Sequence, residues 1–318
     1  MSKSLHASHG VVFRDPKSYF GYFGWPTVAR LPDGTLVVGA SGFRHEHICP
    51  FGKTVLFASK DEGKTWSPPE IVNDSPLDDR DVGLLPLGKD SLLVSWFTSD
   101  IRAFAKWHKP LAQWPQLLSG WEAANPRRWI GSFVRLRTGG IWGAPIPVAP
   151  SAPHGPIRLA SGDLFYLGKQ FGLRKNGKLV FGMNGMNRPI VCALSKDGGK
   201  TWKDLGVVPL PKGVRGENFH EPHAVELPSG KILGQIRFQD YGKKTPFRPT
   251  FSIFQTESLD GGKTWSEAGP TGVCGSPPHL LRHSTGILIG TYGYRAKPYG
   301  ERVMLSRDEG KSWDSDFI

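Results

Sequence analysis

The sequence has little of what redox, metal-binding and disulfide-stabilised proteins depend on. Its 318 residues include only three cysteines, Cys49, Cys192 and Cys274, at spacings that match no metal-binding or redox motif. An odd number of cysteines also argues against a disulfide framework. His45 and His47 form a lone His-x-His pair, which is too weak a pattern to predict a metal site. We therefore expect neither a metal nor another cofactor.

Long apolar runs are absent as well. No run approaches the roughly 20 residues that a transmembrane helix needs, so a membrane is not an expected partner. The first ten residues, MSKSLHASHG, lack the apolar centre of a signal peptide, and a cytoplasmic location is the expectation.

Acidic residues are scarce relative to basic ones. The chain has 28 Asp and Glu against 40 Lys and Arg, a formal net charge of +12. The excess indicates either a generally basic surface or a basic cleft for an anionic ligand. The basic residues are spread along the chain without a recognition motif, so nucleic acid is not an expected partner. No particular oligomeric state is favoured.

Glycine, proline and tryptophan are abundant instead. Forty Gly and 27 Pro predict many short strands joined by turns, and 11 Trp indicate a large core. We expect helix to be a minor component of the fold.

An octapeptide with the pattern S-x-D-x-G-x-T/S-W occurs four times, and a worn fifth copy keeps only its Gly and Trp. The Asp is suited to accept hydrogen bonds from turn N–H groups, the Gly to adopt a left-handed backbone, and the Trp to bury a large ring. Because one active site cannot exist in four copies, we predict a structural turn. The copies are Ser59–Trp66, Ser195–Trp202, Ser258–Trp265, Ser306–Trp313 and, worn, Arg135–Trp142.

A second repeated element precedes each octapeptide: two apolar runs separated by a Gly-containing turn, which predicts a β-hairpin. The hairpins are expected at Val28–Ala40, Gly83–Phe97, Ile157–Gly168, Ala224–Phe238 and Leu280–Arg295. Hairpin, strand, turn and strand together make a four-stranded blade, and radial repetition makes a β-propeller.

We predict an all-β, six-bladed propeller that occupies residues 1–318 as a single domain. The fifth unit shows no convincing outer strand after Trp313, so the last blade is expected to be incomplete in this chain. A strand around Gly10–Arg14 is expected to contribute to closure. A Trp-rich segment at about 104–130 interrupts the repeat, and we interpret it as an insertion with its own small core, or as a lid or aromatic platform for a sugar.

Polar residues stand just before the hairpins, where the first strand of each blade begins. These positions line either a wet central channel or a convergent polar pocket. The candidates are Trp25, Arg80, Asp81, His154, Glu221, His223 and His279.

The octapeptides are identified as Asp boxes (BNR repeats), and with the hairpins they resemble the sialidase, or neuraminidase, superfamily of six-bladed propellers. The resemblance spans nearly the whole chain. It implies an arginine triad for a sugar carboxylate, a Tyr–Glu pair and an acidic proton donor. HEPHAVELPSGKILGQIRF resembles the stretch that carries the Glu and one Arg, which implies Glu221 and Arg237. PYGERVMLSRDEG resembles the stretch with a further triad Arg, which implies Arg302, with Arg295 as its competitor.

The sequence departs from the family at three places. The family's nucleophilic Tyr falls in the blade after the last Asp box, beyond Ile318, so we expect either a longer chain or another group in its role. The family's first arginine lies in a Phe-Arg-Ile-Pro motif, which here reads Phe23-Gly24-Trp25-Pro26. The loop that carries the family's acid/base Asp reads GFRHEHICPFGK. There Arg44 is expected to supply the missing charge, and Glu46, His45 or His47 to transfer a proton.

The resemblance implies an exo-acting glycoside hydrolase that cleaves a terminal, acidic sugar, so a carbohydrate is the expected ligand. Two alternatives stay open: a glycan-binding propeller without catalysis, and a uronate lyase that uses histidines titrating near neutral pH. Catalysis is assigned to Glu221, Glu46, His45 and His223. Substrate binding is assigned to Trp25, Arg44, Arg80, Asp81, His154, Arg237, His279, Arg295 and Arg302.

Overall fold

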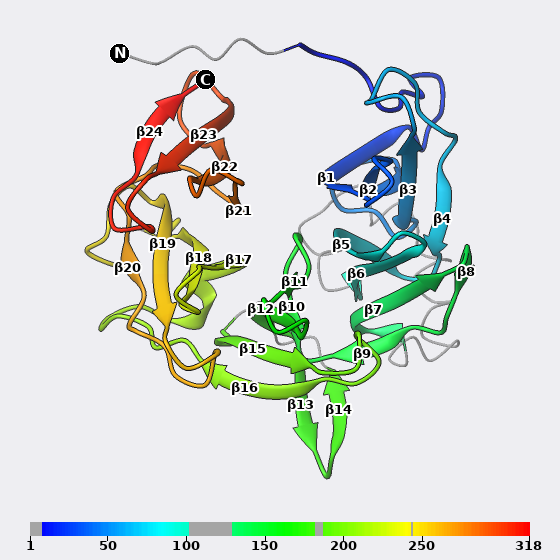
Figure 1. Ribbon diagram of the computed structural model, residues 1–318. Helices are drawn as coiled ribbons and strands as arrows, with labels where there is room; N and C mark the ends of the chain where they lie inside the picture. The colour runs from blue at the N-terminus through cyan, green and yellow to red at the C-terminus, as the bar shows by residue number, and fades with distance from the viewer. Residues whose placement is uncertain (1–7, 102–128, 182–186, 243) are drawn as a thin grey trace. The chain divides into compact units, whose positions relative to one another are not determined.

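The computed structural model describes residues 8–101, 129–181, 187–242 and 244–318. The chain divides into two compact units. Unit 1 comprises residues 1–8, 149–170 and 184–318, and unit 2 comprises residues 9–148 and 171–183. The strands are labelled in Figure 1.

Unit 2 contains two antiparallel sheets, each ordered along the chain, and a separate hairpin. The first sheet is β1 (Tyr22–Arg30), β2 (Leu36–Arg44), β3 (Lys53–Ser59) and β4 (Glu70–Asn73). The second is β5 (Asp78–Gly88), β6 (Ser91–Ser99), β7 (Gly131–Thr138) and β8 (Ile141–Trp142), with β9 (Ile146–Val148) also paired to β7. The hairpin is β13 (Gly172–Lys175) and β14 (Lys178–Phe181).

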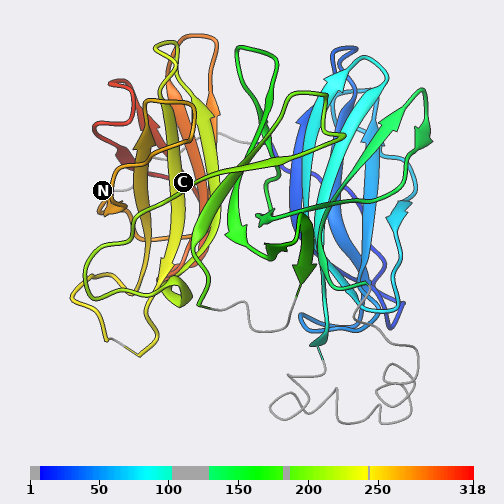
Figure 2. The ribbon, with the colours of Figure 1, turned by 90° about the horizontal axis from the view of Figure 1, so that it is seen from below.

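Unit 1 contains three sheets of the same kind. The first is β10 (Pro150–Ser151), β12 (Leu164–Gln170), β15 (Ile190–Ser195) and β16 (Lys203–Val207), with β11 (Ile157–Arg158) paired to β12. The second is β17 (Phe219–Glu226), β18 (Ile232–Gln239), β19 (Phe251–Ser258) and β20 (Gly269–Pro270), preceded by the short 3₁₀ turn η3 (Gly216–Asn218). The third is β21 (Pro278–Arg282), β22 (Leu288–Tyr294), β23 (Gly300–Ser306) and β24 (Asp314–Phe317). Figure 2 shows the strands of each sheet running side by side.

The all-β propeller architecture is confirmed, but the predicted number of blades is wrong. The described residues form five blades, not six, and all five predicted hairpins are antiparallel pairs. The fifth blade is complete, because β24 pairs with β23 through Val303 and Phe317. Its polar DSDF sequence hid this edge strand. Residues 10–14 form no strand, and Val12 and Phe13 instead pack against the first blade.

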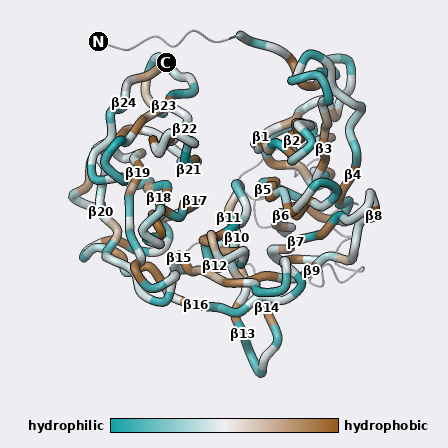
Figure 3. Tube along the Cα trace, viewed as in Figure 1, coloured by the Kyte–Doolittle hydropathy of each residue, from teal (hydrophilic) through white to brown (hydrophobic). Residues whose placement is uncertain are grey.

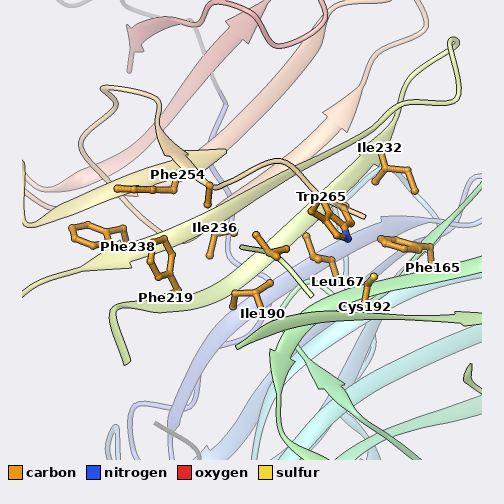
Figure 4. Packing of buried hydrophobic residues seen from close by; sticks show 13 residues of the cluster. Phe165, Leu167, Ile190, Cys192, Phe219, Ile232, Ile236, Phe238, Phe254 and Trp265 are labelled. Carbon is orange, nitrogen blue, oxygen red and sulfur yellow. The ribbon is translucent and has the colours of Figure 1, made fainter. Parts of the chain in front are cut away.

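Within each unit, the core lies between neighbouring blades. In unit 1, aromatic side chains of β12, β17, β18 and β19 form one cluster, shown in Figure 4: Phe165, Phe219, Phe238 and Phe254, all fully buried. Burial of such a side chain contributes about 1.5–3 kcal/mol. In unit 2, Val37 and Leu56 of the first blade pack with Val82 and Leu84 of the second. The inner strands β2, β12 and β18 are buried over several consecutive residues, because both of their faces lie against other side chains, and Figure 3 shows hydrophobic stretches along the strands of both units.

The octapeptides occupy one place in the blades, the turn between the third and fourth strands. In Ser195–Trp202, the Asp197 carboxylate accepts hydrogen bonds from the N–H and hydroxyl of Thr201, at 2.9 and 2.6 Å. The Ser195 hydroxyl donates to Asp197 and accepts from the Gly199 N–H. These bonds lower the pKa of Asp197 to about 2. The predicted local turn is confirmed, and Ser59, Ser258 and Ser306 make the same bonds.

These turns also fasten one blade to the preceding one. In unit 1, a Cβ on Gly262 would lie 2.5 Å from the Phe165 ring, and Gly262 has a φ of +89°, so only glycine suits this contact. The Gly262 carbonyl also accepts a hydrogen bond from the thiol of the buried Cys192, at 3.1 Å. In the next blade, Trp313 Nε1 donates to Gln255 Oε1 at 2.8 Å.

Most of the predicted Trp-rich insertion at 104–130 lies outside the described residues. Trp129 lies within them and is exposed. Among the residues that the structure does describe, no helix is long and apolar enough to span a bilayer.

Removal of the buried hydroxyl from an octapeptide turn should destabilise the fold. Ser195→Ala leaves the buried Gly199 N–H without its acceptor, which should lower the free energy of unfolding by about 1–3 kcal/mol. Urea unfolding followed by tryptophan fluorescence measures this. The exposed Ser284→Ala should change it by less than about 0.5 kcal/mol. Equal effects of the two substitutions would contradict the structural role of the turn.

Candidate functional site

Three first strands contain a β-bulge just before the hairpin, and each bulge holds a non-glycine residue in the left-handed region. The shifts in register lie between Gly24 and Thr27 in β1, Arg80 and Gly83 in β5, and His220 and His223 in β17. Within them, Trp25, Asp81 and Glu221 have φ values of 54°, 56° and 46°. Such strained residues cluster at functional sites. All three were candidates from sequence.

In unit 1, the Glu221 bulge lies beside Arg237 of β18. Arg237 Nη1 donates to Glu221 Oε2 at 2.6 Å, and the two side chains are 16% and 25% exposed, in that order. Glu221 and Arg237 are both expected site residues, but the sequence does not predict that they form an ion pair with each other. Among the described residues, Glu221 Oε1 makes no hydrogen bond, and the side chain is partly exposed.

A line of polar side chains continues from Arg237 into the unit. Arg237 Nη2 donates to Gln239 Oε1 at 2.6 Å, and the Gln239 amide nitrogen lies 3.0 Å from His220 Nε2. His220 Nδ1 lies 3.2 Å from Lys169 Nζ of β12. Burial lowers the pKa of Lys169 to about 7 and that of His220 to about 3. The positively charged Lys169 adds to the shift of His220.

Two further arginines of unit 1 lie on aromatic rings. The guanidinium groups of Arg237 and Arg295 lie 5.7 and 5.8 Å from the centroid of the Phe251 ring, so this ring joins two predicted sugar-binding arginines. Arg295 Nε also donates to the Ser276 carbonyl at 3.0 Å. Arg302 lies over the Tyr294 ring at 3.4 Å.

The three predicted histidines of unit 1 come together in one cluster. The His223 and His279 rings stack with centroids 4.3 Å apart, and His154 meets them edge-on at 5.4 and 5.1 Å. His223 Nδ1 accepts from the Leu280 N–H at 3.0 Å, so its proton lies on Nε2. Among the residues that the structure describes, the buried His154 Nε2 has no hydrogen-bond partner.

The expectation that these histidines titrate near neutral pH is wrong. Burial is the main cause: it lowers the pKa of His154 and His223 well below 6.5 and that of His279 to about 4. The nearby His279 ring lowers the pKa of His154 and His223 further. Removal from water disfavours the charged imidazolium, so all three rings are neutral at pH 7.

In unit 2, two arginines and a histidine lie around the Trp25 ring. The guanidinium groups of Arg80 and Arg44 lie 4.4 and 5.0 Å from the Trp25 ring, and the His47 ring lies 5.0 Å away. Arg80 is also 3.5 Å from Asp78. Trp25 and Arg80, both predicted site residues, therefore lie together in unit 2, beside Arg44.

Arg44 does not have the free charge that the sequence led us to expect. Its side chain is fully buried, and it donates to both oxygens of Asp78, at 2.5 and 2.9 Å. Asp78 is equally buried and lies 34 residues away along the chain. Because both Nη atoms of Arg44 donate to the one Asp78 carboxylate, its charge is neutralised. Arg44 Nη2 also donates to the His47 carbonyl, so the side chain holds the loop in place.

The loop that follows β2 brings an imidazole between a thiol and a carboxylate. His45 Nδ1 lies 3.0 Å from Cys49 Sγ, and His45 Nε2 lies 2.7 Å from Glu46 Oε1. Tyr19 stacks on the His45 ring at 5.6 Å. Burial raises the pKa of the Cys49 thiol, so it is not a nucleophile here but an anchor for the ring. Glu46, 31% exposed, is the accessible member.

No group of three or more His, Cys, Asp and Glu side chains is arranged to hold a metal ion in the part of the chain that the structure describes. Five residues that support the candidates were not predicted from the sequence: the polar Lys169, His220, Gln239 and Asp78, and the aromatic Phe251. Each lies in an ordinary strand, and only the pairing of strands brings it to the site. His220 had the one available signal, its position next to Glu221.

No family model and no curated protein matches the chain. Solved structures do. A protein of unknown function from Dyadobacter fermentans is 21% identical, with a TM-score of 0.70, over 95% of this chain and 82% of that one. A sialidase from Streptococcus pneumoniae is 13% identical, with a TM-score of 0.63, over 96% of this chain. The chain spans 62% of that sialidase.

An α-L-arabinanase from Penicillium chrysogenum, complexed with arabinobiose, is 16% identical, with a TM-score of 0.53, over 92% of this chain and 81% of that one. At such low identities, the likeness shows the fold, a β-propeller.

The histidine cluster should make unit 1 sensitive to acid. Its rings have a lower pKa in the folded than in the unfolded chain, so their contribution is complete above pH 6.5 and is lost as the pH falls below it. His223→Asn keeps an acceptor for Leu280 and should reduce the fall in unfolding free energy between pH 7 and 5 by roughly 2 kcal/mol.

Urea unfolding at the two pH values measures this fall. The exposed His9→Asn is the control and should leave it unchanged. A fall as large in His223→Asn as in the wild type would contradict the burial of a neutral ring.

Proposed function

We propose that this chain is a sialidase-like glycoside hydrolase that releases a terminal sugar bearing a carboxylate, and that its octapeptide turns are Asp boxes. The observation that carries the proposal is the strained Glu221 bulge, whose carboxylate is paired with Arg237 and partly exposed. Strain of this kind persists where the surrounding structure holds a functional group in place.

Glu221 is suited to act as a base. One of its oxygens is held by Arg237 at 2.6 Å, which fixes the direction of the carboxylate, and Oε1 is left to accept a proton from a nucleophile. A base within hydrogen-bond reach of a hydroxyl accelerates its attack, typically by 10²–10⁴-fold. In this proposal, Arg237 is a positioning and binding residue at once.

An acidic sugar fits the charges of unit 1. Arg237 and Arg295 flank the Phe251 ring, Arg302 lies nearby in the chain on β23, and the whole protein has a formal charge of +12. Guanidinium groups bind a carboxylate in two-pronged fashion. These cations favour the substrate of the sialidase relative over the neutral sugar bound to the arabinanase.

Unit 2, taken by itself, also has groups suited to a sugar. Within it, Glu46, oriented by His45, is proposed to transfer a proton, while Trp25, Arg80 and Asp81 are proposed for contacts with a sugar. The Arg80 guanidinium lies over the Trp25 ring at 4.4 Å, so the two side chains are proposed to contact the sugar together.

One observation favours the second candidate function, a propeller that binds an acidic glycan without cleaving it. Arg44, expected to replace the family's first arginine, is neutralised by Asp78. A histidine-based lyase is disfavoured, since imidazoles with a pKa far below 6.5 are weak bases for proton abstraction.

Glu221→Gln should reduce turnover at least about 100-fold, because an amide cannot accept the proton. The assay measures release of 4-methylumbelliferone from its N-acetylneuraminic acid glycoside and of 4-nitrophenol from its α-L-arabinofuranoside. Activity on the first substrate and not on the second is the expected result for the wild type.

Glu267→Gln, an exposed carboxylate in the same unit, is the matched control and should keep full activity. Full activity of Glu221→Gln would remove Glu221 from the mechanism. Binding of the sialoside by the wild type without any product would instead establish the glycan-binding function.

A further inference from the structure

Lys169 is a partly buried lysine that neither the repeat pattern nor the proposed chemistry uses. It lies at the end of β12, and its ammonium group has three acceptors: the Gly216 carbonyl at 3.0 Å, the Phe219 carbonyl at 2.9 Å and His220 Nδ1 at 3.2 Å. An ammonium group has three N–H donors, so all of them are used. Lys169 therefore ties β12 to the segment that leads into the Glu221 bulge.

We infer that Lys169 is a positioning residue for the Glu221–Arg237 pair, and that His220 and Gln239 connect its protonation state to that pair. The connection is a row of contacts, each at hydrogen-bond distance. It runs from Lys169 to His220, from His220 to Gln239, from Gln239 to Arg237 and from Arg237 to Glu221, with separations of 3.2, 3.0, 2.6 and 2.6 Å.

The tautomer of His220 is what couples the two ends. With its proton on Nε2, the ring donates to the Glu217 carbonyl at 2.8 Å, and Nδ1 accepts from the Lys169 ammonium. With its proton on Nδ1, the ring donates to an uncharged Lys169 amine, and Nε2 accepts from the Gln239 amide. Gln239 cannot turn over without losing Arg237, because its oxygen accepts from Arg237 Nη2.

The change from the first form to the second releases one proton. Lys169 releases one proton to solvent as the pH rises, while His220 stays neutral and its single hydrogen moves from Nε2 to Nδ1. In the second form, Gln239 gains a hydrogen bond from its amide, which polarises the oxygen that holds Arg237. The charge beside the Glu221–Arg237 pair therefore falls by one.

The groups that face Lys169 set where this change occurs. Burial lowers the pKa of Lys169 to about 7, the Glu221 and Glu217 carboxylates raise it, and Arg237 lowers it. His220 has a pKa of about 3 and does not take up the proton. The change thus lies near neutral pH, and its position should respond to the charge on each of these neighbours.

The direct test is nuclear magnetic resonance of protein labelled with ¹⁵N at the lysine side chains, titrated from pH 5 to 10. One lysine should titrate near pH 7, and its signal should be absent from Lys169→Met. Glu221→Gln should lower its midpoint, and Arg237→Met should raise it, each by roughly 1 unit. A midpoint near the ordinary 10.5, or one that neither variant moves, would overturn the inference.

The catalytic readout rests on the proposed function and uses whichever glycoside the wild type hydrolyses. The rate should change several-fold between pH 6 and 8 in the wild type. Lys169→Arg, which stays charged, should keep the pH 6 rate and lose this change, whereas a merely structural lysine would leave the pH profile in place.

The exposed Lys196→Met is the matched control, with the pH profile of the wild type. If the wild type hydrolyses neither glycoside, the proposed function fails, and the two titration midpoints alone decide the role of Lys169.

Discussion

Within unit 1, the contacts that two octapeptide turns make with the preceding blade, through Gly262 and Trp313, are the constraint on which the rest of the unit depends. Gly262 approaches Phe165 so closely that no side chain fits between them, and Trp313 reaches Gln255 of the blade before it. Blades fixed at this end keep the register of their first strands. That rigidity is what allows Glu221 to remain in a strained backbone conformation.

Much of the fold could be predicted, because it repeats. The hairpins were found from alternating apolar residues and a turn glycine such as Gly34 or Gly230, and every one exists. The predicted number of blades was wrong because the edge strand β24 was not recognised. Its sequence is polar, and it is a strand because it pairs with β23 through Val303. Periodicity does not record such a pairing.

Less of the candidate site could be predicted. Glu221, Trp25 and Asp81 were found because the register of the repeat places them at equivalent positions, and their bulges agree with it. The charge state of the others depends on contacts distant in sequence. Arg44 is neutralised by Asp78, 34 residues away, and His223 is kept neutral by burial against His279 and His154. Neither effect can be predicted from the residues adjacent to Arg44 or His223 in the sequence.

The hydrogen bonds of Ser195, Asp197 and Thr201 close within eight residues, so the turn needs nothing from the remainder of its blade. The residues of the bulges lie in a different strand and take no part in that closure. A duplicated blade would thus inherit its architecture intact, while its first strand is free to acquire a new reactive group. The residues that stabilise a blade are thus separate from those that can carry a reactive group, so the reactive groups can change in one blade without loss of the fold.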